Sequence, residues 1–160
     1  MILVDLNQVL ISNLMAQARG MVDELPDKSM LRHMVLNSLR GYNLKFKHEY
    51  GTIILCADGA NPWRRGIFPN YKHSRRKGRE EDTKDWSSLF KMIGEIREEL
   101  AQNFPYITLH IDGVEADDII AVLVKENYTK EKIMIVSGDK DFIQLHKYEG
   151  VKQYPPIQKK

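Results

Sequence analysis

Seven acidic residues follow short apolar runs at four separate places in the sequence. The runs 2–5, 53–57, 107–111 and 133–137 have the length and composition of buried β-strands. The acids at or just beyond their ends are Asp5, Asp58, Glu115, Asp117, Asp118, Asp139 and Asp141. Because the carboxyl ends of parallel strands share one edge of a sheet, we expect the seven side chains to converge there.

A cluster of carboxylates predicts a site for a hard cation. Like charges raise one another's pKa and are costly to gather unless cations neutralise them. An all-oxygen ligand set favours Mg²⁺, with Mn²⁺ as a substitute, and the five histidines are too scattered to suggest zinc. Two such ions about 4 Å apart can activate a water molecule and stabilise the leaving oxygen of a phosphodiester.

Each acid alone has a simpler interpretation. A single Asp after a strand is most often a turn residue or a helix N-cap, and Asp112 is assigned to a turn. Acids at four successive strand ends favour the metal site instead. Neighbouring helical residues point about 100° apart, so Asp117 and Asp118 cannot both face one ion directly, and one of them would act through water.

A basic segment at 59–83 interrupts the alternation of strands and helices. Within it, residues 64–79 hold seven Lys and Arg and no acid, a charge of +7 that leaves 2 − 7 = −5 for the rest of the chain. The basic residues are Arg64, Arg65, Lys72, Arg75, Arg76, Lys77 and Arg79. Trp63, Phe68 and Tyr71 lie among them, a mixture typical of surfaces that bind phosphates and stack on unpaired bases.

The alternative interpretation of this segment is a solvated charged loop. A helix over 71–82 would instead gather Tyr71 and several basic residues on a cationic face. Because the segment follows the strand that ends at Asp58, we expect it to lie over the acidic edge. Lys72 or Arg75 could then stabilise the charge that develops on a phosphate under attack.

The periodicity predicts an α/β fold, a three-layer sandwich with a mostly parallel central sheet, formed by residues 1–160 as one domain. Helical spacing covers 8–19, 28–49, 84–103 and 116–127, with a short helix at 142–147 and a last edge strand at 151–154. The apolar residues of the third helix are interpreted as core: Trp86, Leu89, Phe90, Ile93, Ile96, Leu100 and Phe104.

Composition limits where such a protein works. The single cysteine, Cys56, excludes an internal disulfide and fits a reducing cytoplasm. No apolar run approaches the ~20 residues that span a bilayer, so we expect no membrane partner.

The sequence resembles the 5′ nuclease superfamily: flap endonucleases, the 5′–3′ exonuclease domains of bacterial DNA polymerase I, and phage 5′ nucleases of the ribonuclease H type. Four pieces carry the resemblance, and the basic YKHSRRKGRE at 71–80 matches the family's helical arch. The pieces are ILVDLNQ (2–8), IILCADGA (53–60), VEADDIIAVLVK (114–125) and IVSGDKDFIQLHKY (135–148).

The resemblance implies a PIN-like fold and two metal sites. Asp5, Asp58, Asp117 and Asp139 would form the first, and Asp141 would serve the second with Glu115 and Asp118 acting partly through water. Lys72 matches the arch lysine that contacts the scissile phosphate, and Tyr71 lies beside it. The implied reaction hydrolyses RNA primers and 5′ flaps during replication, acting on DNA and RNA–DNA hybrids and leaving 5′ phosphates.

One departure from the family concerns its C-terminal part. Family members continue with a helix–hairpin–helix-like DNA-binding region and further aspartates, both absent from this sequence. We therefore expect a weak second metal site and help from a separate C-terminal chain or replication proteins. The alternatives are a PIN-type ribonuclease, a non-catalytic nucleic-acid-binding remnant, and a small-molecule phosphohydrolase, which would leave the basic segment without a use.

Overall fold

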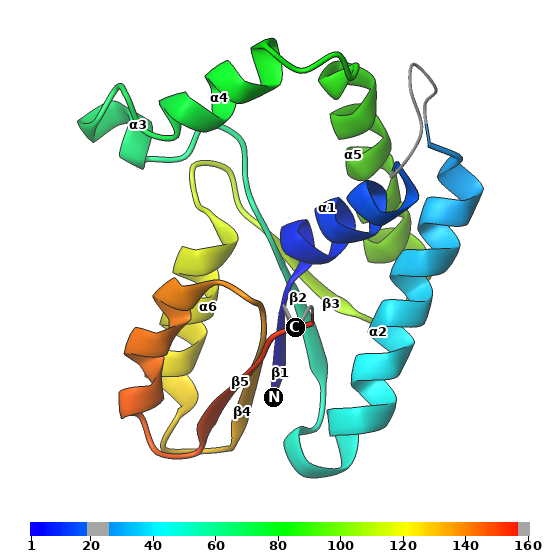
Figure 1. The fold of residues 1–160 in the computed structure, drawn as a ribbon. Coiled ribbons are helices and arrows are strands. Elements are labelled where there is room, and N and C mark those ends of the chain that lie inside the picture. The colour runs from blue at the N-terminus through cyan, green and yellow to red at the C-terminus, as the bar shows by residue number, and fades with distance from the viewer. Residues whose placement is uncertain (19–25, 157–160) are drawn as a thin grey trace.

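The computed structural model describes residues 1–18 and 26–156 and contains a parallel sheet with the strand order β3-β2-β1-β4-β5 (Figure 1). Each neighbouring pair of strands is parallel, and Ile2 lies opposite both Ile53 and Met134. The strands are β1 (Ile2–Asp5), β2 (Ile53–Ala57), β3 (Ile107–His110), β4 (Ile133–Val136) and β5 (Val151–Tyr154). The predicted parallel sheet is confirmed, and residues 151–154 form an edge strand.

Helices cover both faces of the sheet, so the predicted three-layer architecture is confirmed (Figure 1). One face packs against α1 (Leu6–Gln17), α2 (Lys28–Tyr50) and α5 (Trp86–Asn103). The other packs against α6 (Ala116–Asn127) and the 3₁₀ helix η1 (Lys140–Lys147). The predicted helix end at residue 19 lies outside the described residues.

The apolar runs are buried because both faces of the sheet are covered. In β1, Ile2 and Val4 face the α1, α2 and α5 layer, whereas Leu3 faces α6. All three side chains are fully buried, and each such burial stabilises the fold by about 1.5–3 kcal/mol. Cys56 is also buried, which raises the pKa of its thiol to about 12 and fits a packing role.

The α5 helix differs in one respect from its predicted core. Leu89, Ile93, Ile96 and Leu100 are buried, and Trp86 and Phe104 pack at the core's margin. Phe90, interpreted as core, is 42% exposed, with the Arg79 guanidinium 5.4 Å from its ring centre. The apolar stripe is therefore wider than the face that the sheet covers, and its edge supports the basic segment.

The basic segment leaves β2 and crosses above the carboxyl ends of the strands before it reaches α5 (Figure 1). It contains α3 (Arg64–Ile67) and α4 (His73–Glu80). The predicted helix over 71–82 is shorter than expected because Lys72 adopts a left-handed conformation with φ of 55°, and α4 begins after it. Among the described helices, none is both long and apolar enough to cross a membrane.

Gly59 fixes the distance between the β2 end and the loop before α6. Its amide donates to the Val114 carbonyl at 2.8 Å, and a Cβ at this position would lie 1.8 Å from the Ile111 carbonyl oxygen. Backbone fills the space that a side chain would need. Glycine at this position therefore lets the segment after Asp58 pack directly against the loop that precedes Glu115.

We expect Gly59→Ala to destabilise the protein by about 2–3 kcal/mol, because neither backbone can move without breaking this contact. Urea unfolding measures the change. The matched control is Gly94→Ala in α5, where a Cβ meets no atom within 4 Å and should stabilise the helix by about 0.5–1 kcal/mol. Equal stabilities for the two variants would contradict the close approach.

Candidate metal and nucleic-acid site

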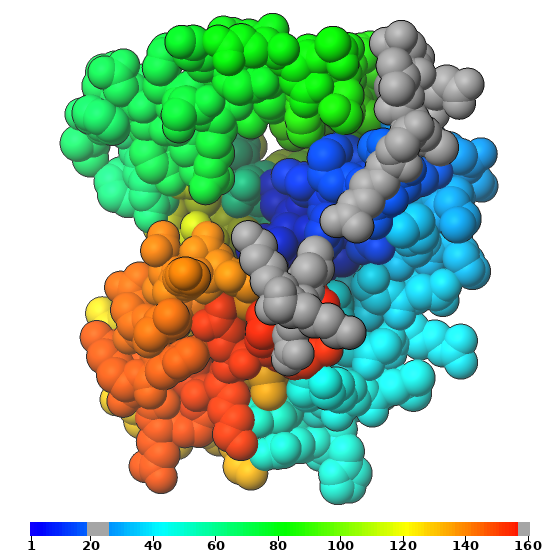
Figure 2. Space-filling model, viewed as in Figure 1, coloured from blue at the N-terminus to red at the C-terminus, as the bar shows by residue number. Residues whose placement is uncertain are grey.

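The ends of three strands and the start of α6 bring Asp5, Asp58, Asp139 and Asp117 into one cleft of about 310 Å³. The space-filling view shows the surface hollowed beneath the basic segment and beside α1 (Figure 2). Lys72 and Arg75 from that segment also line the cleft. Acids from four distant parts of the sequence therefore share a small space with two basic side chains of the overlying segment.

Asp5 lies deepest in the cleft and is 7% exposed. One carboxylate oxygen accepts from the Gln8 amide at 3.0 Å as the N-cap of α1, and the other accepts from the Ser137 hydroxyl at 3.1 Å. Burial is the main reason that its pKa is raised to about 6, and the charges of Asp58 and Asp139 raise it further. The capping bonds favour the ionised form but do not offset these effects.

Asp117 projects from the first turn of α6 into the same cleft. Burial raises the pKa of this carboxyl to about 6, and the charges of Asp5, Asp139 and Asp58 add to the increase. Lys72 acts in the opposite direction but more weakly. Burial is thus the main cause of the raised pKa values of Asp5 and Asp117, and the charges of the neighbouring acids add to it.

Asp58 and Asp139 are held in place through the backbone around them. The Asp58 amide donates to the Asn7 side chain at 3.1 Å, and the Asp58 carboxylate accepts from the Ala116 amide at 2.8 Å. This second bond joins the end of β2 to the start of α6. Asp139 caps η1 by accepting from the Asp141 amide at 2.9 Å.

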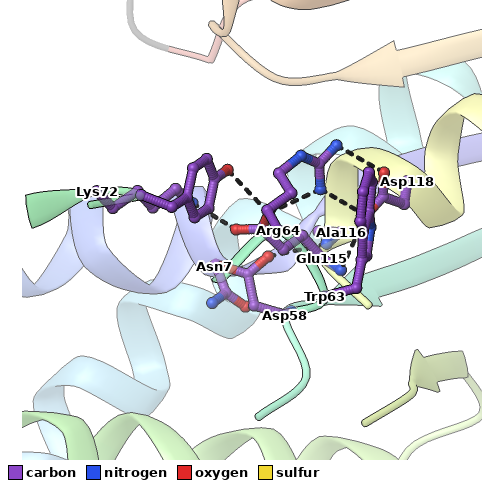
Figure 3. Close-up of polar contacts among 9 residues, drawn as sticks. Asn7, Asp58, Trp63, Arg64, Lys72, Glu115, Ala116 and Asp118 are labelled. Carbon is purple, nitrogen blue, oxygen red and sulfur yellow. Dashed lines mark hydrogen bonds and ion pairs between the residues drawn. The ribbon is translucent and has the colours of Figure 1, made fainter. Parts of the chain in front are cut away.

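Glu115 and Asp118 make ion pairs with the basic segment (Figure 3). Lys72 Nζ lies 2.7 Å from Glu115, and the two terminal nitrogens of Arg64 each lie 2.7 Å from one Asp118 oxygen. Arg64 also reaches Glu115 at 2.8 Å. These contacts tie the basic segment to the N-terminal end of α6, and we name them the arch clamp.

In the arch clamp the pKa values of the acids are lowered, whereas those of Asp5 and Asp117 in the cleft are raised. Burial raises the pKa of Glu115, but hydrogen bonds from Lys72 and Tyr71 outweigh it, so the pKa is lowered overall. Hydrogen bonds from Arg64 lower the pKa of Asp118. Both acids of the arch clamp are already paired with protein cations.

Asp141 is exposed and lines a separate hollow of about 280 Å³. Asp117 and Asp118 also line this hollow, as do Arg64 and Tyr71 of the basic segment. Asp117 is thus the acid shared by both hollows. The seven predicted metal ligands therefore divide into four that line the cleft, two in the arch clamp, and Asp141.

The predicted nucleic-acid-binding residues divide in a similar way. Arg64, Tyr71 and Lys72 contact the acids of α6, and Arg75 lines the cleft. Arg65, Arg76 and Lys77 are exposed. The side chains of Arg76 and Lys77 lie 3.6 and 3.7 Å from Glu80 and Glu81 in exposed pairs that are worth little. Trp63 and Phe68 are 51% and 57% exposed.

Several site residues were not predicted from the sequence. Asn7, Gln8 and Ser12 of α1 line the cleft, and Ser137 bonds to Asp5. Two signals in the sequence could have indicated them: the polar pair Asn7 and Gln8 shortly after Asp5, and Ser137 at the end of the fourth apolar run. Polar residues just after parallel strands lie near the same edge of the sheet as the acids. Gln153 of β5 bonds to the loop that carries Asp139, and no local signal marked it.

The donor set of the cleft fits a hard divalent cation. It consists of four carboxylates, and burial with mutual repulsion raises the pKa of two of them. Within residues 1–18 and 26–156, no group of three or more His, Cys, Asp or Glu is yet arranged to hold an ion. Like charges gathered in one cleft repel one another, and a bound divalent cation would offset that repulsion.

Comparison with known proteins identifies relatives across the whole chain. The chain is 42% identical to the ribonuclease H of Enterobacteria phage T4 over 168 residues, covering 99% of this chain and 52% of that protein. It is 34% identical to the flap endonuclease Xni of Shewanella piezotolerans, covering 69% of this chain and 40% of that one. The chain thus spans about half the length of these relatives.

Solved structures share the fold. The 5′-exonuclease of bacteriophage T5 with bound zinc superposes with a TM-score of 0.76 at 19% identity, covering 97% of this chain and 54% of that chain. A complex of the T5 flap endonuclease with DNA and metal ions gives a TM-score of 0.76 at 20% identity, covering 96% and 54%. The family model "5′-3′ exonuclease, N-terminal resolvase-like domain" matches residues 1–159, and the chain therefore belongs to this family.

Proposed function

We propose that this chain is the catalytic module of a metal-dependent 5′ nuclease that hydrolyses phosphodiesters of RNA primers or DNA flaps during replication. The observation that carries the proposal is the cleft, where four carboxylates face Lys72 and Arg75. The carboxylates would hold divalent cations, and the two basic side chains would bind a phosphate of the nucleic acid in the same cleft. Membership of the 5′–3′ exonuclease family supports this reaction over that of a PIN-type ribonuclease.

Asp5, Asp58, Asp117 and Asp139 are the proposed ligands of the first ion, which we take to be Mg²⁺ with Mn²⁺ as a substitute. Bound divalent ions would supply an activated water molecule and stabilise the leaving oxygen. Asp141 is the proposed ligand for a second, weaker ion. Glu115 and Asp118 join it only when Lys72 and Arg64 leave them, because those cations already neutralise both acids.

The basic segment would bind the nucleic acid. A phosphate that enters the cleft competes with Glu115 for Lys72, so substrate binding would loosen the arch clamp. Arg75 faces the same phosphate from α4. The exposed rings of Trp63 and Phe68 are suited to stacking on unpaired bases of a flap or a 5′ end.

The chain matches about half the length of its relatives. We propose that a region equivalent to their remaining half strengthens duplex binding and the second metal site, either in the same polypeptide or in a separate one. The proposed substrates are DNA and RNA–DNA hybrids in the cytoplasm. A non-catalytic remnant would bind them without Mg²⁺-dependent turnover, and that outcome would contradict the proposal.

We expect Asp117→Asn to abolish cleavage of a 5′-flap substrate in Mg²⁺, because the variant lacks a central ligand. Its DNA affinity should be unchanged or higher, since a negative charge beside the phosphate is removed. Gel assays of cleavage and fluorescence anisotropy of binding measure the two effects. Asp112→Asn, an exposed turn residue close in sequence, is the control and should cleave normally; cleavage by Asp117→Asn would refute a ligand role.

Stability of the metal-free protein should fall as pH rises from about 4.5 to about 6.5. The folded pKa of Asp5 and of Asp117 is about 6, above the ordinary value of 3.8, so the folded state holds more protons in this window. Ionisation then costs on the order of 2 kcal/mol for Asp5. The measurement is urea unfolding in chelator across this range.

Two further results follow from the same raised pKa values. Asp117→Asn should raise metal-free stability at pH 7.5 by about 1 kcal/mol and shrink the pH dependence. Millimolar Mn²⁺ should stabilise the wild type at pH 7.5 more than at pH 5, because protons compete for the ligands. Stability that stays level or rises through the window would show that folding does not raise the pKa values of Asp5 and Asp117.

DNA binding should weaken steeply with salt, because the proposed contacts are to phosphates. Replacing Arg75 by Gln should reduce the slope of log affinity against log salt by about 0.7–0.9, the value for one contact. Lys130→Gln, beyond the far end of α6, is the control and should leave the slope unchanged. A salt-independent affinity would exclude the basic segment as the binding surface.

A further inference from the structure

The loop 137–139 between β4 and η1 carries Asp139 and is hydrogen-bonded to β5, to α1 and to Asp5. The Ser137 amide donates to the Tyr154 carbonyl at 3.2 Å, and the Gly138 amide donates to the Gln8 side chain at 2.6 Å. The Asp139 amide donates to the Ser137 hydroxyl at 3.1 Å, and that hydroxyl donates to Asp5. The loop therefore connects two of the four cleft acids through one serine.

Gln153 of β5 holds the carbonyl side of this loop. Its side-chain Nε2 donates to the Ser137 carbonyl at 2.8 Å and to the Asp139 carbonyl at 2.7 Å. Only the NH₂ end of a carboxamide can satisfy two carbonyls, which fixes the orientation of the amide. Its oxygen then points away and accepts from His146 Nε2 at 3.1 Å.

The hydrogen bonds from Gln153 restrain the loop that carries Asp139, one of the acids that repel one another in the cleft. Asp139 lines the same cleft as Asp5 and Asp117, and like charges that share one cleft repel one another. Asp139 stands on a short loop rather than inside a helix or strand. Two hydrogen bonds from one side chain to residues two apart fix the curvature of that loop and oppose its movement away from the cleft.

We propose that Gln153 is a positioning residue for Asp139 and thereby raises the affinity of the cleft for divalent cations. The inference deepens the proposed function and depends on it. Gln153 touches neither substrate nor the reacting atoms, and it acts through the Asp139 backbone. Groups in this relation to a metal ligand typically change metal affinity by 10–100-fold.

The test measures Mn²⁺ affinity by isothermal titration calorimetry in the full chain, without nucleic acid. Gln153→Met keeps the length of the side chain and removes both donated hydrogen bonds. Gln153→Asn keeps the donor but shortens it, and serves if the Met variant does not fold, which circular dichroism reports. Lys152→Met, an exposed neighbour on the same strand, is the matched control.

Gln153→Met should weaken Mn²⁺ binding by about tenfold. The same change in an Asp139→Asn background should cost less than about twofold, because the residue that Gln153 positions no longer supplies a carboxylate. The Lys152→Met control should bind as the wild type does. In cleavage assays at limiting Mn²⁺, Gln153→Met should be rescued by raising the Mn²⁺ concentration.

Other outcomes separate two kinds of failure. Unchanged affinity in Gln153→Met, or equal losses in both backgrounds, would overturn the positioning role and leave the proposed function standing. A wild-type chain that binds no Mn²⁺ at millimolar concentration would overturn the proposed function and, with it, this inference.

Discussion

The gathering of four partly or fully buried carboxylates at one sheet edge is the constraint on which the rest of this structure depends. Parallel strands deliver Asp5, Asp58 and Asp139 to that edge, and the helix after β3 adds Asp117. Burial and mutual repulsion raise the pKa of Asp5 and Asp117, so the protein bears a cost that no contact nearby removes. A fold that gathers charge at such a cost is stable where a cation offsets it.

Beside the cleft, the basic segment neutralises a buried acid. Glu115 is buried and would be costly if unpaired, but Lys72, Tyr71 and Arg64 bond to it. The arch clamp thus stabilises α6 at its acidic start and holds the basic segment above the cleft. The same cations are those that a phosphate would attract, which connects the fold of the segment with the proposed binding of nucleic acid.

The fold could be predicted from the sequence because its signals are local. The strands at 2–5, 53–57 and 133–136 consist almost wholly of apolar residues because both faces of the sheet are covered. The start of α6 at Ala116 follows from Glu115 before it and from the two acids in its first turn. The convergence of Asp5 with Asp58 follows from parallel topology alone.

What the sequence could not reveal depends on side-chain direction. Spacing places Glu115 and Asp117 at the same helix end, but only the structure shows one facing Lys72 and the other facing the cleft. The left-handed Lys72, which delays the start of α4, has no signal in a run of basic residues. Gln153 reaches the Asp139 loop because β5 pairs with β4, a contact that spacing does not encode.

Anomalous X-ray diffraction from crystals grown with Mn²⁺ tests the central claim most directly. The account predicts a Mn²⁺ peak in the cleft, within ligand distance of at least three among Asp5, Asp58, Asp117 and Asp139, with those side chains drawn closer together. A cleft without a peak at millimolar Mn²⁺, or a peak only at surface acids elsewhere, would contradict it.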